Sequence, residues 1–283
     1  MSSDLAEEIG RRAGSPVVRL RPAGGGSIAE SYRVDLVDGR SVFAKTHANP
    51  PAGLFATEAD GLRWIAECPS VRVPAVLGGH EGLLIMNWVA PGKQSPLAEE
   101  RLGRGLAELH RLGAPHFGRH GVGFIGDLPR DDSPADTWCE FWFERRLAPL
   151  VRKAVDLGTM AVDAVALLER LSIRMEALLG PPEPPARIHG DLWAGNVIWG
   201  ADDHPWLIDP AAHGGHRELD LAMLRLFDSP GERLFDAYAE RFPLAPGWQE
   251  RVPLFQLEPL LVHAVLFGPS WGAKAIATME RVS

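Results

Sequence analysis

Three polar side chains in the C-terminal half of the chain are of the types that phosphoryl transfer requires. Asp191 and Asn196 lie between apolar runs short enough to be buried strands, and Asp209 follows the run 206–208. Such a reaction needs a carboxylate to orient the attacking hydroxyl, and oxygen ligands to hold magnesium against the phosphates of a nucleotide. The segment 187–210 therefore predicts a phosphoryl-transfer site.

The spacing within this segment is informative. His189, Asp191 and Asn196 have the spacing of the catalytic loop of protein kinases and of their small-molecule relatives, and Asp209 stands thirteen residues after Asn196, where that superfamily keeps a metal-binding aspartate. The alternative is a turn between two core strands, with Asp191 and Asn196 as turn formers. A turn needs only one such residue and leaves Asp209 unexplained.

Composition describes an ordinary globular protein. The chain has 283 residues, 46% hydrophobic and 23% charged, enough for one large domain or two lobes. A net charge of −8 argues against broad nucleic-acid binding and is weakly compatible with a cationic substrate. Two cysteines, Cys68 and Cys139, and a start without signal-peptide features predict a reducing cytoplasm. No apolar run approaches the roughly 20 residues that a membrane span requires.

The first ninety residues predict an antiparallel sheet. Alternating and apolar runs, with a hairpin signal at Asp38 and Gly39, indicate five strands at 17–20, 31–37, 40–45, 76–77 and 82–89. A helix is expected from Pro50 to about residue 67, and a short opening helix over 3–12. Pro91 and Gly92 break the chain, which predicts a lobe of residues 1–89, a hinge of 90–95 and a second lobe of 96–283.

Several residues of the first lobe could contact a nucleotide. Backbone N–H groups of the glycine turn 24–26 could approach an anion, although such a turn is as often a plain hairpin. Lys45 could reach phosphates from the third strand, and Glu58 could pair with it from the helix. The alternatives are a solvated lysine and an exposed helix carboxylate. The strand end 86–89 offers backbone groups to adenine.

From Ser95 onward the patterns are mainly helical. No long segment separates Asp209 from the next helix, which argues against a protein kinase regulated by loop phosphorylation. The aromatic stripe with Phe141 and Trp142 is assigned to packing. Expected helices cover 96–112, 137–147, about 160–179, 219–227, 232–241 and 248–267, with a closing helix after Gly272.

The chain resembles the fructosamine (ketosamine) kinase family, within the aminoglycoside- and choline-kinase-like group of small-molecule kinases. The resemblance covers almost the whole chain. The distinctive pieces are the tryptophan after Asp191-Leu192 and the string from Gly215 to Met223, whereas the loop spacing alone belongs to the wider superfamily. The residues that carry it are 24–32, 189–196, 209–223 and 266–268.

The resemblance implies an α+β, protein-kinase-like fold with two lobes: a five-stranded antiparallel sheet with one helix, then a mainly α-helical C-terminal lobe. It implies Asp191 as the catalytic base, Asn196 and Asp209 as Mg2+ ligands, Lys45 on the phosphates of ATP and Glu58 orienting Lys45. The expected reaction moves the γ-phosphate of ATP to a sugar hydroxyl of a ketoamine, a step in deglycation. The remaining nucleotide-binding predictions are Gly25, Gly26, Ser27, Met86, Asn87 and Val89.

The acceptor site is predicted in the helical lobe. Trp193 and Trp271 could offer flat faces to a sugar ring, while His216, Arg217 and Glu218 could bind its hydroxyls or amine. Tryptophans are, however, usually core residues, and Arg217 could simply pair with or cap the helix. Two positions depart from the family pattern. Asn87 stands where an acid is common, and Trp271 where a tyrosine-like residue is expected.

Three functions remain open on sequence alone. The first is a ketoamine kinase, with ATP and a small-molecule or glycated-amine acceptor as partners, no nucleic acid or membrane partner, and a monomeric or weakly dimeric state. The second is a kinase for an aminoglycoside, choline, homoserine or a thio-sugar. The third, a catalytically dead nucleotide-binding module, is disfavoured because Lys45, Asp191, Asn196 and Asp209 are all present.

Overall fold

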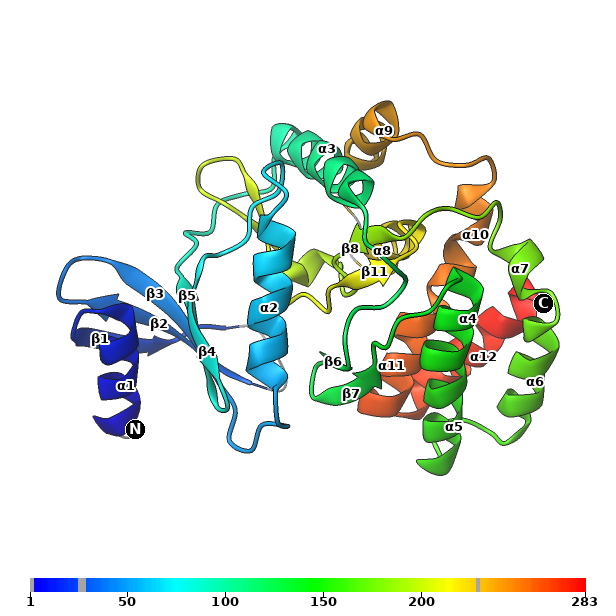
Figure 1. Cartoon of the computed structure of the whole chain (residues 1–283), viewed down its shortest axis with the longest axis horizontal. Coiled ribbons are helices and arrows are strands. Elements are labelled where there is room, and N and C mark those ends of the chain that lie inside the picture. The colour runs from blue at the N-terminus through cyan, green and yellow to red at the C-terminus, as the bar shows by residue number, and fades with distance from the viewer. Residues whose placement is uncertain (1–2, 25–28, 228–229) are drawn as a thin grey trace.

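A five-stranded antiparallel sheet forms the N-terminal part of the protein (Figure 1). The computed structural model describes residues 3–24, 29–227 and 230–283. The strands are β1 (Val17–Pro22), β2 (Glu30–Leu36), β3 (Ser41–Thr46), β4 (Val76–His80) and β5 (Leu83–Asn87). They lie in the order β1-β2-β3-β5-β4, so β3 is central, and its Lys45 is opposite Ser31 on one side and Leu84 on the other. The expected sheet is confirmed.

Helices cover both faces of this sheet. The fold description from sequence gave the sheet one helix, whereas in the structure α1 covers one face and α2 the other. The apolar run of β5 shows why. Leu83 and Ile85 pack in one cluster with α1 (Ser3–Ala13), whereas Leu84 and Met86 point to the other face and pack against α2 (Leu54–Ala66). A strand buried on both sides is continuously apolar rather than alternating. In Figure 1, α2 lies between the sheet and the rest of the molecule.

Short strand pairs carry the loops of the central segment. β8 (Ala186–Ile188) pairs with β11 (His213–Gly215), and β9 (Val197–Trp199) pairs with β10 (Pro205–Leu207). The loop 189–196 runs between β8 and β9, and the loop 208–212 between β10 and β11. The two antiparallel pairs therefore hold both loops side by side at one end of the helical lobe.

The glycine-rich segment 116–126 contributes to a hairpin that was not expected from sequence. β6 (Val122–Ile125) pairs with β7 (Leu128–Asp131), and Phe124 packs in the same cluster as Phe55 and Leu62 of α2. The hairpin thus joins the helical lobe to the helix that covers the sheet. The connection 88–95 is tied to the helical lobe as well, because Gly92 N–H donates to the carbonyl of Trp199 at 2.6 Å.

The remaining helices build the second lobe, and two predicted helices are each divided. The expected helix 160–179 is α6 and α7, and the expected helix 248–267 is α10 and α11. Pro259 explains the second break, since a proline lacks the N–H for residue 255 and its ring crowds that carbonyl. The bounds are α3 Pro96–Leu112, α4 Trp138–Trp142, a π-helical turn Phe143–Leu147, α5 Ala148–Asp156, α6 Asp163–Ser172, α7 Met175–Leu178, α8 Glu218–Leu224, α9 Glu232–Arg241, α10 Trp248–Phe255, α11 Leu257–Phe267 and α12 Pro269–Val282.

Among the residues with described structure, no helix is both long and apolar enough to cross a membrane.

The main core of the helical lobe gathers α5, α6, α11 and α12 around buried residues such as Trp142, Leu168 and Leu261. A second cluster, with Leu106, Leu192 and Leu221, lies beneath the central loops.

The contact between α3 and α9 depends on Gly103. A methyl group there would lie 2.1 Å from the carbonyl oxygen of Leu234, so the two helices would have to separate. In a free helix, Gly→Ala is favourable by up to about 1 kcal/mol. We predict that Gly103→Ala instead lowers the free energy of unfolding by about 2 kcal/mol through overpacking. Urea denaturation measures it, with Gly61→Ala, whose methyl would find ordinary 3.4 Å contacts, as control. Equal stability of the two variants would contradict the prediction.

Candidate active site

A cleft of about 760 Å³ lies between the sheet and the helical lobe. Side chains from four separate segments meet in it: β3, α2, the loop 189–196 and the loop 208–212. These are Lys45, Glu58, Asp191, Asn196 and Asp209, all predicted as site residues from sequence. The structure therefore brings together the predicted polar groups of both lobes in one cavity.

Lys45 is held between two carboxylates. Its ammonium lies 3.0 Å from Glu58 and 3.1 Å from Asp209, and the side chains of Lys45 and Glu58 are 15% and 10% exposed. Burial alone would lower the pKa of Lys45, but the two carboxylates outweigh it and raise that pKa. Burial also raises the pKa of Glu58, against the opposing effect of Lys45. The lysine is therefore a permanent cation fixed in direction by Glu58.

The loop that carries Asp191 is anchored from behind by Asp220 of α8. Asp220 is fully buried and accepts hydrogen bonds from the backbone N–H groups of His189 at 2.7 Å and Gly190 at 2.9 Å. His110 lies 3.2 Å from the same carboxylate. Burial alone would raise the pKa of Asp220, but these hydrogen bonds lower it, so the group stays ionised.

Gly190 allows the tight turn of this loop. Its φ is +79°, and a Cβ there would be 2.3 Å from the carbonyl oxygen of Ala211. Any side chain would push the loop 189–196 away from the loop 208–212. Asp209 itself has a φ of +52°, an uncommon conformation for a residue with a Cβ. Such backbone strain is typical of functional sites.

Asp191 is half-buried on the floor of the cleft. Asn196 donates from Nδ2 to the Asp191 backbone carbonyl at 2.8 Å and to its Oδ2 at 3.1 Å. Burial, with the nearby charge of Asp209, raises the pKa of Asp191 to about 7, while Arg130 and the Asn196 hydrogen bond oppose this. A carboxylate with a pKa near neutrality is suited to accept a proton from a hydroxyl.

The donor set next to Asp191 fits a magnesium ion. Because Nδ2 of Asn196 is used as a donor, its Oδ1 is left as an acceptor, and Asp209 supplies a carboxylate that is one-third exposed to the cleft. Among the described residues there is no cluster of three or more acids, histidines or cysteines suited to a metal. Mg2+ commonly takes only one or two protein oxygens and fills its other positions with waters and phosphates.

The predicted nucleotide contacts fall into two groups. Met86, Asn87 and Val89 line the cleft at the end of β5, as does Gly24 from the glycine turn. Gly25, Gly26 and Ser27 lie outside the described residues. The end of β5 and the residues after it therefore form part of the cleft wall, where a planar base would need backbone partners.

The two predicted acceptor tryptophans take different places. Trp193 lines the cleft and is 39% exposed. Trp271 lies in the first turn of α12, behind the lining, with its ring 5.8 Å from that of Phe227, which in turn lies 5.8 Å from Trp193. Trp193 thus reaches the cleft directly, whereas Trp271 supports it through Phe227.

The structure does not bring His216, Arg217 and Glu218 into the cleft. His216 is buried with its ring 4.8 Å from Phe255, and burial lowers its pKa to about 4. Arg217 donates twice to Glu183 at 2.6 Å. The reason is topological. β11 pairs with β8 inside the lobe, so the chain after Gly215 emerges on the side away from Asp209.

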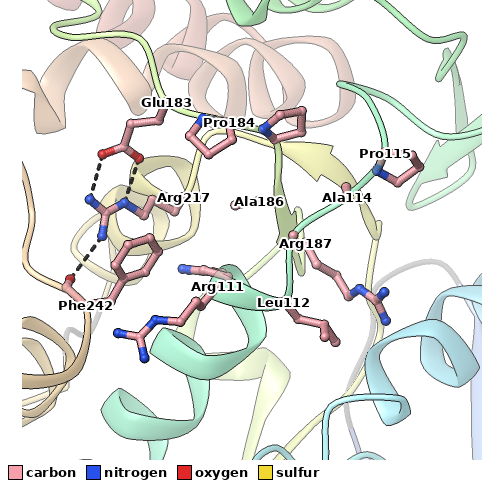
Figure 2. A pocket seen from close by; sticks show the side chains of 13 residues that line it. Arg111, Leu112, Ala114, Pro115, Glu183, Pro184, Ala186, Arg187, Arg217 and Phe242 are labelled. Atoms are coloured by element: carbon pink, nitrogen blue, oxygen red, sulfur yellow. Dashed lines mark hydrogen bonds and ion pairs between the residues drawn. The ribbon is translucent and has the colours of Figure 1, made fainter.

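Arg217 instead lines a second cavity of about 540 Å³, which lies between the end of α3 and the segment 183–187. Figure 2 shows its ion pair with Glu183 and its hydrogen bond to the backbone carbonyl of Phe242, so its donors are used within the protein. Glu218 is likewise occupied, since Arg251 donates to both of its oxygens at 2.5 and 2.9 Å. These residues connect elements of the second lobe.

Sequence reasoning missed residues on both sides of Asp191. Arg130, from the unexpected hairpin, donates to the carbonyl of Ala211 at 2.5 Å. Its positive charge opposes the rise in the pKa of Asp191. Nothing in the sequence around Arg130 points to this role. His263 and Phe267 of α11 line the cleft. Their helical spacing with Pro259 was visible, but a stripe at that spacing predicts core more often than ligand contact.

Fold and site together define a protein-kinase-like phosphotransferase. Solved structures with the same fold include a macrolide 2'-phosphotransferase from Brachybacterium faecium, with a TM-score of 0.61 and 18% identity over 98% of this chain and 97% of that one. At that identity the likeness concerns the fold alone. The sequence model of the fructosamine kinase family matches residues 1–283, and the chain belongs to this family. The family predicted from the sequence motifs is confirmed.

Individual relatives agree with this assignment. A probable ketoamine kinase from Thermus thermophilus is 36% identical over 270 residues, 94% of each chain, and one from Enterococcus faecium is 34% identical over 265 residues, 93% of this chain and 94% of that one. A crystal structure from Thermobifida fusca, provisionally named fructosamine-3-kinase, superposes with a TM-score of 0.94 at 44% identity and covers 100% of this chain and 99% of that one.

The anchoring by Asp220 can be tested with Asp220→Asn. An amide has one acceptor oxygen where the carboxylate serves two backbone N–H groups and His110, so a buried donor loses its partner. We predict a loss of about 2 kcal/mol in the free energy of unfolding. We also predict a lower kcat, because the loop 189–196 shifts. Exposed Asp236→Asn is the control, and wild-type values for Asp220→Asn would contradict the anchoring role.

Proposed function

We propose that the protein is an ATP-dependent kinase that transfers the γ-phosphate to a sugar hydroxyl of a ketoamine. The observation that carries the proposal is the meeting of Lys45, Glu58, Asp191, Asn196 and Asp209 in one cleft. Membership of the fructosamine kinase family and the names of the relatives support the acceptor class. The cleft is a protein-lined cavity of the size that small-molecule sites usually have.

In this proposal Asp191 is the catalytic base. It accepts the proton of the attacking sugar hydroxyl as the oxygen bonds to the γ-phosphorus of ATP and ADP leaves with the electrons of the broken bond. Its raised pKa of about 7 suits the task, and the Asn196 hydrogen bond holds the carboxylate in one orientation. Lys45, directed by Glu58, binds phosphate oxygens of the nucleotide.

Asn196 and Asp209 are the residues that would hold magnesium, through the amide oxygen and the carboxylate. The ion, when bound, neutralises charge on the phosphates. Asp209 would supply its carboxylate to the ion, and Lys45, which lies 3.1 Å from Asp209 in this structure, would be left for the phosphates. Backbone groups near Met86 and Val89 receive the adenine.

The acidic residues of the cleft bear on the competing acceptor class, the aminoglycosides. Among the described residues, the carboxylates that line the cleft are those of Glu58, Asp191 and Asp209, and all three have roles at the phosphates. A polycationic aminoglycoside would need further acids for its ammonium groups. A ketoamine, with its single amine, does not. The cytoplasmic location and the monomeric or weakly dimeric state stay predictions.

Substitution of the base should separate binding from chemistry. We predict that Asp191→Asn binds ATP with near wild-type affinity and loses at least about 100-fold in kcat, because each ~1.4 kcal/mol of lost transition-state stabilisation is tenfold in rate. Asp209→Ala should also weaken binding of magnesium-ATP. Calorimetric titration and steady-state kinetics measure both, with exposed Asp156→Asn as control. Turnover of Asp191→Asn near that of the wild type would exclude the mechanism.

An acceptor panel tests the substrate class. We expect magnesium-dependent ATP consumption with a fructosyl-amine or a ribulosyl-amine, and none above background with kanamycin, choline or homoserine. Coupled detection of ADP gives kcat/KM for each compound. Turnover of another acceptor alone would keep the kinase chemistry and exclude the ketoamine, while ATP binding without any turnover would favour an inactive nucleotide-binding module.

A further inference from the structure

Five rings from four segments form one connected cluster on the helical side of the cleft, and three of them, Trp193, His263 and Phe267, line it. We call this cluster the aromatic shelf, and it consists of Trp193, Phe227, His263, Phe267 and Trp271. The Trp193–Phe227 and Phe227–Trp271 ring centroids are 5.8 Å apart and nearly edge-to-face, and His263 lies 4.6 Å from Trp271 and 5.2 Å from Phe267. These are favourable geometries for aromatic pairs, so the rings hold one another in place.

The shelf continues from the reaction centre to solvent. Trp193, two residues after Asp191, lines the cleft together with His263 and Phe267. Trp193 is 39% and Phe267 50% exposed, although both are large apolar side chains. Exposed aromatic area beside a polar reaction centre is typical of a ligand-binding surface rather than of a core.

His263 places one hydrogen-bond acceptor within this shelf. Its Nδ1 lies 2.7 Å from the carbonyl oxygen of Pro259, which can only accept, so Nδ1 carries the hydrogen. Burial lowers the pKa of His263, which keeps the ring neutral and leaves Nε2 as an acceptor. Nε2 has no hydrogen-bond partner among the residues with described structure. It suits an N–H donor on a bound ligand.

A positive charge lies next to Trp271, beside the residues that line the cleft. The Lys274 ammonium lies 4.0 Å from the ring centroid of Trp271, and Lys274 makes no ion pair within the described ranges 3–24, 29–227 and 230–283. Among the described residues that line the cleft, the carboxylates are at its phosphate end. A second cationic group, beyond the amine of the ketoamine and near Lys274, would therefore meet a like charge without a counter-ion from the described residues, whereas a carboxylate would meet an ammonium.

We infer that the aromatic shelf binds the substituent on the amine nitrogen of the ketoamine, with Nε2 of His263 accepting a hydrogen bond from that amine. The favoured substituent is flat or apolar and uncharged or anionic, and a cationic chain is disfavoured. Phe267, which lines the cleft, is then a specificity-determining residue in contact with the part of the substrate that does not react, and Lys274 acts on that part through its charge. The inference rests on the proposed function, because it needs a ketoamine in the cleft.

The test uses one sugar with four amine substituents: fructosyl-amines of methylamine, benzylamine, 4-(aminomethyl)benzoate and cadaverine. The quantity measured is kcat/KM for each, relative to the methylamine compound. We expect benzylamine to gain about tenfold, from ring contacts of ordinary strength. The benzoate should equal or exceed benzylamine, and cadaverine should fall below it.

Two variants locate the effect. Phe267→Ala should reduce the benzylamine gain to about threefold or less, and Lys274→Glu should reverse the order of benzoate and cadaverine at low salt but not at high salt. Leu112→Ala, at the same 50% exposure but away from the cleft, should leave every ratio unchanged. Thermal melting checks that each variant is folded.

The outcomes separate the two proposals. Turnover of the methylamine compound with equal kcat/KM for all four substrates, or ratios that Phe267→Ala leaves unchanged, would overturn the role of the shelf and keep the kinase proposal. A preference for cadaverine would overturn the charge assignment. No turnover of any fructosyl- or ribulosyl-amine, with ATP still bound, would overturn both.

Discussion

The contact of Lys45 with both Glu58 and Asp209 is the interaction on which the site depends. It joins a central strand, the helix over that strand and a loop of the other lobe. A buried ammonium needs partners, because an uncompensated charge in a poorly solvated place is costly. Packing of α2 on the sheet, and of the hairpin with Phe124 on α2, keeps those partners within reach. The two lobes are therefore coupled through charge as well as through apolar contact.

A second constraint acts on the backbone. Asp220 holds two successive N–H groups of the loop 189–196, and Gly190 lets that loop approach Ala211. Asp191 consequently has a fixed place without needing many side-chain contacts of its own. Its remaining partner, Asn196, leaves one carboxylate oxygen open to the cleft. Preorganisation of this kind is what a positioned base requires.

The polar string 216–218 lies inside the helical lobe, although it was predicted together with Trp193 and Trp271 to bind the acceptor. Arg217 and Glu218 make internal ion pairs with Glu183 and Arg251, which tie distant parts of the helical lobe together. The open half of the cleft is instead apolar and aromatic. A family-specific motif can thus preserve the architecture behind a site, whereas the apolar side of the cleft comes largely from α11, where the residues resemble ordinary core.

The amino-acid sequence by itself determined the fold family, the sheet with its five strands and the polar centre, since strand alternation and the spacing of Asp191, Asn196 and Asp209 are local patterns, and together with Lys45 and Glu58 they point to one chemistry. The tertiary structure decided which neighbours face that centre. The contact of the β6–β7 hairpin with α2 and the pairing of β11 with β8 are both pairings between distant segments. Such pairings are set by packing of the whole chain, and no local spacing encodes them.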